Sequence, residues 1–472
     1  MSARLYVAVA ILAVVPIWSV RYLPTVDGPS HVYNSWILHE LLRGHGGPIA
    51  QWFAINWRPH PNWIGHATMA GLMFVVSPVI AEKLFVTGLI ALFLFAMWRY
   101  ARSPFAAFLA VPFAYNRLFH FGFYNFCFGS ALYFLIVALW WRRRDRPNVR
   151  TVSLIAALLV LCYFSHAMTV MLAMGSIGLL WLLTIRGRRL GTHALHLLSF
   201  VPVMPLLWWF RSTGATYLDA EAKGSGLIGF LARGEVLYTL GRAQRGYALA
   251  VTILLAIGIV VTLVRREWRW REDDAWIVLS IVIFGLYFLS AFVAADVRDR
   301  MALFVTLSVL SWLDLRLTSR SLTMATAILS VAWIGYVVSH YRHTGAFIQR
   351  YLRSAEALGE RSTFMPVLYE IGPPDNLAPI YYHAIDYMAI RKASVDISNY
   401  EPVLGYFPIA MRPGVEPGDI FVAKPEDVNP SEIAKRARYL FTWKMPAPLH
   451  ERIAPWYTLV SDSDGGALFR RK

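Results

Sequence analysis

Long stretches without a charged residue are the feature that most constrains how this chain can fold. The stretch from 151 to 185 contains none, and 57% of all residues are hydrophobic while only 16% are charged. Crossing a hydrocarbon core of about 30 Å takes roughly 17–25 apolar residues. Twelve segments approach this requirement, namely 5–20, 64–81, 84–98, 104–116, 124–141, 151–165, 167–184, 194–210, 247–264, 276–293, 300–314 and 322–339. The sequence therefore predicts an all-α polytopic membrane domain, formed by residues 1–340.

Basic residues between the apolar segments predict the orientation, because Lys and Arg in short loops stay cytoplasmic. Four clusters are assigned inside: Arg142, Arg143, Arg144 and Arg146; Arg186, Arg188 and Arg189; Arg265, Arg266, Arg269 and Arg271; and, more weakly, Arg316 and Arg320. The N-terminus is then cytoplasmic. A large first loop (22–62), the loops 211–246 and 294–299, and everything after 340 lie outside.

This assignment needs an odd number of crossings, so one of the segments between 62 and 141 does not cross. Residues 64–81 are the suspect, which leaves about eleven spans in the cell (inner) membrane. The stretch 151–185 becomes a hairpin whose tip, Ser165-His166, faces outside.

Residues 341–472 differ in composition, with Pro, Asp, Glu and Lys throughout, and are long enough for a small soluble domain. Strand-like runs alternate with helical patterns, which is typical of an α/β fold. The runs are Phe364–Ile371, Asp419–Ala423, Tyr439–Trp443 and Tyr457–Val460, with helices over Tyr381–Lys392 and Pro430–Ala437. The stretch 461–466 predicts a closing hairpin.

The sequence disfavours several classes of protein and of site. The net charge of +16 comes from short clusters between apolar blocks, so it indicates membrane orientation and not nucleic-acid binding. Cys127 and Cys162 both lie in apolar segments, which argues against a disulfide framework or a thiolate metal site. The first twenty residues lack a cleavage pattern and are interpreted as a retained span. No nucleotide-binding glycine motif or nucleophile elbow is present.

Asp27 is the leading candidate for a catalytic residue. It follows the first span directly, and Gly28-Pro29 begin a helix with an apolar stripe of Val32, Trp36, Ile37 and Leu41. We expect this helix to lie in the membrane interface, with Asp27 at its positive N-terminal end and His31 one turn on. The alternative is that Asp27 merely caps the helix, a role worth about 1 kcal/mol.

Other polar residues assigned outside are candidates for substrate binding. His60 lies where the first loop returns to the membrane, although for His60 alone a Pro-rich turn is the favoured interpretation. Arg117 and His120 lie between two apolar segments, and His166 lies at the hairpin tip. Arg300, with Arg298, stands at the mouth of a later span, where it would hold a lipid phosphate or snorkel to the interface.

A metal site is the remaining option for the histidines. His31, His60, His66, His120 and His166 invite it, but no pair has the i,i+4 spacing of a helical zinc motif. We assign no metal site and no cofactor, with a divalent cation left as an alternative.

The architecture resembles that of the GT-C superfamily of membrane glycosyltransferases, which use polyprenyl-phosphate-linked sugars. The similar features are the cytoplasmic N-terminus, Asp27 with His31 in a large first outer loop, His60-Pro61 at its return, about eleven spans and an outer C-terminal domain. Two features depart from the pattern. Asp27 stands alone where many members have paired acids, and Asn125 or His120 stands where several have an acid in a second loop.

The resemblance implies inverting transfer of a sugar to an envelope glycan, lipid or protein, with membrane lipids as surroundings and no nucleic acid as partner. Asp27 would act on the acceptor hydroxyl, and Arg117 or Arg300 would stabilise the departing polyprenyl phosphate. A transporter or flippase for a lipid-linked saccharide is the runner-up, although the chain has no detectable repeat. A scaffold whose soluble domain binds envelope partners is a third interpretation.

Overall fold

The computed structural model is mostly helical, with a small sheet near the C-terminus. It describes residues 2–45, 47–185, 190–213, 226–266, 269–290, 295–313, 320–374, 376–418 and 429–472. The predicted basic residues Arg186, Arg188, Arg189 and Arg316 and the predicted strand Asp419–Ala423 lie outside these ranges.

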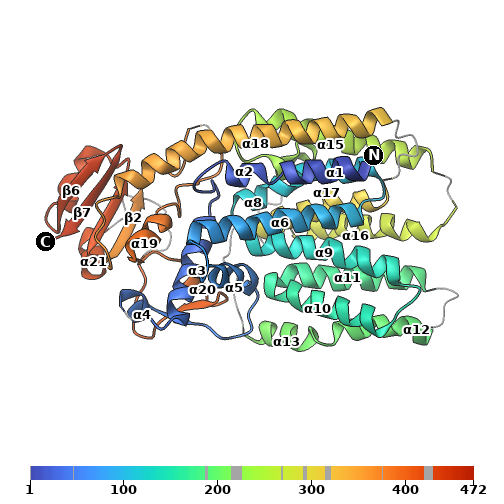
Figure 1. The fold of residues 1–472 in the computed structure, drawn as a ribbon, viewed down its shortest axis with the longest axis horizontal. Coiled ribbons are helices and arrows are strands. Elements are labelled where there is room, and N and C mark those ends of the chain that lie inside the picture. Colours follow the sequence, from blue (N-terminus) through green and yellow to red (C-terminus); the bar gives the residue numbers. More distant parts are fainter. Residues whose placement is uncertain are drawn as a thin grey trace. The chain divides into compact units, whose positions relative to one another are not determined.

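The helices and strands are followed in Figure 1. The helices are α1 (Ser2–Leu12), α2 (Val15–Trp18), α3 (Gly28–Leu42), α4 (Pro48–Trp52), α5 (Trp63–Leu72), α6 (Pro78–Tyr100), α7 (Pro104–Ala110), α8 (Arg117–His120), α9 (Tyr124–Arg143), α10 (Val149–Ser165), α11 (Ala167–Thr184), α12 (Leu190–Ala194), α13 (Met204–Ser212), α14 (Leu227–Ala232), α15 (Gln244–Val264), α16 (Ala275–Ser290), α17 (Ala295–Ser308), α18 (Arg320–Ser354), α19 (Asp386–Lys392), α20 (Glu401–Leu404), α21 (Pro430–Arg436) and α22 (His450–Ile453). The strands are β1 (Phe53–Ile55), β2 (Thr363–Leu368), β3 (Val395–Asp396), β4 (Ile409–Met411), β5 (Tyr439–Trp443), β6 (Tyr457–Ser463) and β7 (Gly466–Arg471). The 3₁₀ segments named below are η1 (Val111–Tyr115), η2 (Leu195–Phe200) and η5 (Val309–Ser311).

Contacts divide the chain into two compact units. The first contains residues 1–16, 87–120 and 124–338, and the second contains 17–86, 121–123 and 339–472. The predicted first outer loop therefore belongs to the same unit as the C-terminal sheet.

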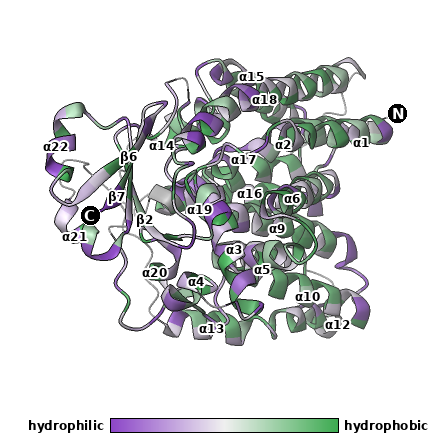
Figure 2. Cartoon of the chain, turned by 60° about the vertical axis from the view of Figure 1, so that its left-hand side comes forward, coloured by the Kyte–Doolittle hydropathy of each residue, from purple (hydrophilic) through white to green (hydrophobic). Residues whose placement is uncertain are grey.

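Among the described residues, six helices are long and apolar enough to cross a membrane, and α10 is a shorter apolar helix of 17 residues. The six are Pro78–Tyr100, Tyr124–Arg143, Ala167–Thr184, Gln244–Val264, Glu272–Ser290 and Ser321–Ser354. In Figure 2 these helices are coloured largely hydrophobic. Large apolar side chains such as Ile253, Val260 and Ile281 are exposed on them, as on surfaces that face lipid. The prediction of a mostly helical membrane protein is thus supported at this coarser level.

Three predicted segments differ in detail from the structure. The suspect segment 64–81 contains only the 10-residue α5 before α6 begins. At 1.5 Å per residue, a helix of this length reaches only about half of a 30 Å core. The segment 104–116 forms the 7-residue α7 followed by the 3₁₀ segment η1. The last predicted span, 322–339, continues to Ser354 as α18, so the change in composition at 341 falls inside a helix.

Two loops assigned to the cytoplasmic side, those that contain Arg144 and residues 265–271, meet within the first unit, and Arg102 and His196 also lie there. Arg102 pairs with Asp273 and Arg144 pairs with Glu272, at 2.7 and 2.8 Å. His196 Nε2 lies 3.0 Å from the Arg144 carbonyl. The helices α10 and α11, joined at His166, lie side by side as the predicted hairpin (Figure 1).

The C-terminal sheet has the order β3-β2-β5-β7-β6, parallel from β3 through β5 and antiparallel beyond. Strands formed at the predicted runs beginning at 364, 439 and 457. The predicted hairpin joins β6 to β7 through Asp464 and Gly465, which both have positive φ, as a two-residue type I′ turn requires. A separate pair, β1 with β4, joins the first loop to residues 409–411.

Candidate functional site

Asp27 lies at the start of α3, and the packing of this helix decides what the carboxylate can do. All residues from Gly28 to His39 are buried, including the polar Ser30, Asn34 and Ser35. The prediction of an interfacial helix with one apolar stripe is therefore wrong, because α5, α19 and other segments of the second unit cover α3 on all sides. Asn34 and Asn399 exchange two amide hydrogen bonds of 3.0 and 2.8 Å, which hold α3 to the C-terminal segment.

The Asp27 side chain makes no capping hydrogen bond to α3. Its backbone has φ −88° and ψ −9°, whereas a capping residue usually has extended backbone. Asp27 Oδ1 instead lies 3.7 Å from His383 Nε2, too far for a hydrogen bond, and the carboxylate is 20% exposed. The geometry thus gives no support to the capping alternative.

His383 is a neutral neighbour of Asp27. Burial lowers the pKa of His383 to about 4, since desolvation outweighs the attraction of Glu401 for the imidazolium form. Its ring lies 5.1 Å from the ring of Tyr400.

A second loop reaches Asp27 through its backbone. The Asp27 N–H donates to the Phe121 carbonyl at 3.1 Å, and Gly122 follows with φ +85°. A Cβ at Gly122 would lie 2.5 Å from the Gly28 nitrogen. Residues 121–123, in the segment where we predicted a second outer loop, therefore pack directly on the start of α3.

We predict that Gly122→Ala destabilises the second unit by about 3 kcal/mol or more. A positive φ alone costs a residue with a Cβ about 1–2 kcal/mol, and overpacking against rigid backbone adds about 1–3 kcal/mol. Thermal denaturation in detergent measures the effect. Gly405→Ala is the matched control, because Gly405 has φ +73° but nothing within 4 Å of the added Cβ. Equal losses of thermal stability in the two variants would show that the contact of Gly122 with the start of α3 is not close.

Three buried side chains meet beside this position. His31 Nδ1 lies 2.7 Å from Glu401 Oε1, and His66 Nε2 lies 2.7 Å from Glu401 Oε2. Burial raises the pKa of Glu401, but the charges of the two histidines and their hydrogen bonds outweigh it, so the carboxyl is ionised at neutral pH. Phe407 lies against both imidazole rings, at 6.1 and 5.6 Å between centroids.

His60 is buried between β1 and α5, and its backbone N–H donates to the Arg58 carbonyl at 2.8 Å. His60 is not one of the three side chains, His31, His66 and Glu401, that meet in this triad. His383 and Glu401 do belong to this cluster, yet the sequence analysis missed both. The sequence offered only one weak signal, an acid in the first turn of a short helix at Glu401-Pro402.

The other candidates lie in the first unit, where segments assigned to the outer face meet. Arg117 Nε lies 3.3 Å from Asp299 Oδ2, and Arg298 also pairs with Asp299 at 2.8 Å. His120 Nδ1 lies 3.0 Å from the Thr239 hydroxyl. Asp299 was not predicted to lie here. Its carboxylate neutralises part of the positive charge that Arg117 and Arg298 would offer to a phosphate.

His166 and Arg300 lie against the same aromatic ring. The His166 ring packs edge-on to Phe126 at 5.2 Å, and the Arg300 guanidinium lies 5.6 Å from the Phe126 centroid. His166 joins α10 to α11, and its buried Nδ1 has no hydrogen-bond partner among the described residues. These two predicted residues are thus brought together within the first unit.

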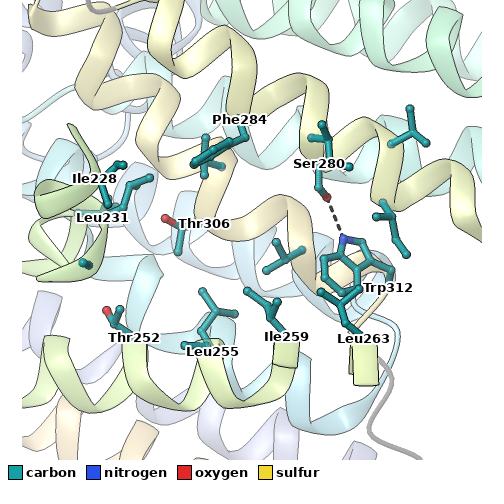
Figure 3. Close-up of a pocket in the computed structure, with 18 of the residues that line it drawn as sticks. Ile228, Leu231, Thr252, Leu255, Ile259, Leu263, Ser280, Phe284, Thr306 and Trp312 are labelled. Carbon is teal, nitrogen blue, oxygen red and sulfur yellow. Dashed lines mark hydrogen bonds between the residues drawn. The ribbon is translucent and has the colours of Figure 1, made fainter. Parts of the chain in front are cut away.

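The first unit also contains an apolar cavity of about 950 Å³. It lies among α14, α15, α16 and α17 with η5, and Figure 3 shows Leu255, Ile259 and Leu263 along one wall and Phe284 on another. The Trp312 indole closes part of it by donating to the Ser280 hydroxyl at 2.9 Å. Arg266 and Arg269 are among the few charged residues that line it.

No protein-family model matches this chain, and no curated protein matches it.

Proposed function

We propose that this chain is an integral membrane glycosyltransferase of the GT-C type, which moves a sugar from a polyprenyl-phosphate-linked donor to an envelope acceptor on the extracytoplasmic face. The observation that carries the proposal is the state of Asp27. Its carboxylate is partly exposed, makes no capping hydrogen bond and lies beside a neutral imidazole. A general base must be within reach of the acceptor hydroxyl, and the partial exposure of Asp27 allows this.

In the proposed reaction, Asp27 accepts the proton of the acceptor hydroxyl. The acceptor oxygen attacks the anomeric carbon as the bond from that carbon to the phosphate oxygen breaks. The polyprenyl phosphate leaves with the electron pair, and the anomeric configuration inverts. Fixed cations would stabilise such a leaving group.

We also propose eleven crossings, with α5 as the segment that does not cross. The path uses α1 with α2, α6, α7 with η1, α9, α10, α11, η2 with α13, α15, α16, α17 with η5, and α18. This path is supported by the contacts among the basic loops at one end of the first unit. It places the C-terminal sheet outside the cytoplasm.

A reporter that is active only in the cytoplasm, fused after Lys472, is expected to stay silent, while the same reporter placed after Arg146 is expected to be active. The physical reason is the retention of the basic loops on the cytoplasmic side. Activity at both positions, or at Lys472 alone, would show that the orientation is wrong.

The apolar cavity suits the hydrocarbon tail of the proposed donor. Its volume lies within the range of about 300–1,000 Å³ that is typical of ligand sites, and its walls offer apolar side chains from four helices. An isoprenoid chain gains free energy there by burying its methyl and methylene groups.

We therefore expect Ile259→Trp, which fills the cavity, to raise the KM for a long-chain polyprenyl donor about tenfold, since about 1.4 kcal/mol of lost burial corresponds to that factor. A donor with a short chain is expected to be affected much less. Ile257→Trp is the matched control, because Ile257 lies on the same helix but is 49% exposed and does not line the cavity. Kinetics with donors of two chain lengths measure both variants. A KM that rises equally for both donors would contradict the assignment of the cavity.

A further inference from the structure

The second unit contains three potential metal ligands that converge from distant parts of the sequence. His31 comes from α3, His66 from α5 and Glu401 from α20. One potential ligand atom from each lies within 4.8 Å of the other two, and all three side chains are buried. We propose that these residues bind one divalent cation of the zinc class, through His31 Nδ1, His66 Nε2 and a carboxylate oxygen of Glu401.

The donor set selects the cation. Two imidazole nitrogens with one carboxylate are ligands that zinc and its first-row neighbours prefer, whereas magnesium and calcium prefer oxygen ligands. The carboxylate and the cation together carry one positive charge, with both imidazoles neutral. Water completes the coordination, as is common where a protein supplies three ligands.

Outer contacts orient the ligands in the way that metal sites require. His66 Nδ1 lies 3.0 Å from the Asn62 carbonyl, which can only accept, so Nδ1 carries the proton. In a neutral ring the lone pair is then on Nε2, the atom that faces Glu401. The Ser30 hydroxyl donates to Glu401 Oε1 at 3.3 Å. Hydrogen bonds of this kind fix ring orientation and tautomer in metal sites.

The surroundings also favour retention of the cation. The two imidazole rings are 5.1 Å apart and nearly perpendicular, and Phe407 packs against both. An apolar cover limits exchange with water and strengthens electrostatic attraction. The cation would link two helices near the first loop to the segment that follows β3. This role is independent of the proposed transferase reaction.

The test uses the full-length chain in detergent, stripped with a chelator and then titrated with Zn²⁺ or Co²⁺. We expect one tightly bound cation per chain, a visible Co²⁺ absorption band typical of a low-coordinate site, and a melting temperature that rises with cation concentration. Glu401→Gln and His66→Gln are expected to lose at least a hundredfold in affinity. His45→Gln is the control, because His45 and Glu40 form a pair of the same 2.7 Å length at an exposed position.

No stoichiometric binding by the wild-type chain, or unchanged affinity in Glu401→Gln and His66→Gln, would overturn the site. If the two variants do not fold, the wild-type stoichiometry and the dependence of its melting temperature on cation concentration decide the question. Neither readout depends on transferase activity, so failure of the metal site and failure of the proposed function are distinguishable.

Discussion

Asp27→Asn is expected to reduce the turnover of sugar transfer by about 10²–10⁴, the contribution typical of a general base. Asparagine preserves the size of the side chain but cannot accept the proton of the acceptor hydroxyl. Because Asp27 makes no capping hydrogen bond, and because asparagine is an equally good capping residue, the substitution should cost little stability. Turnover, donor binding and melting temperature are measured on the same purified sample.

Asp462→Asn is the control for this experiment. Asp462 is exposed on β6, so the substitution removes one negative charge at a position outside the site. Near-normal turnover in Asp27→Asn would defeat the catalytic role of Asp27. A loss of turnover accompanied by an equal loss of folded protein would point to a structural role instead.

The second large effect is expected at Glu401. Glu401→Ala leaves the buried His31 and His66 facing each other without the carboxylate that accepts from both. Breaking a buried charged cluster by removing one partner costs about 3–5 kcal/mol. Since about 1 kcal/mol shifts the melting temperature by 2–4 °C in a domain of 150–250 residues, we expect a fall of roughly 6–20 °C.

Thermal denaturation in the presence of a chelator measures this effect without any contribution from a bound cation. Glu432→Ala is the control, because Glu432 pairs with Lys435 on an exposed helix face, where such pairs contribute little. A fall in the Glu401 variant no larger than in the control would mean that the cluster does not stabilise the second unit.

Local signals explain what could be predicted from the sequence. The α10–α11 hairpin follows from one uncharged stretch between two basic loops, and the β6–β7 hairpin follows from an Asp-Gly turn. Both depend only on residues that are close in sequence. The environment of α3 does not, because its polar face is covered by segments more than 300 residues away, such as Asn399.

The convergence of His31, His66 and Glu401 could not be predicted from the sequence for the same reason. We compared histidine spacings with those of a single helix, which detects only sites whose ligands share that helix. Glu401 is 370 residues from His31, and no local pattern connects them. By contrast, His166 and Arg300 were predicted because they are rare polar groups in apolar surroundings. A polar group costs free energy in such surroundings, and its position is visible in the sequence.

The account is tested most directly by supplying the purified chain in proteoliposomes with a panel of polyprenyl-phosphate-linked hexoses and pentoses and an envelope extract as the acceptor. Release of free polyprenyl phosphate and formation of a new glycosidic product are followed for each donor. We expect at least one donor to be consumed, with an inverted anomeric configuration in the product and consumption about 10²–10⁴ slower with Asp27→Asn. Movement of an intact lipid-linked saccharide across the bilayer, with no donor cleaved, would contradict the account and identify a transporter.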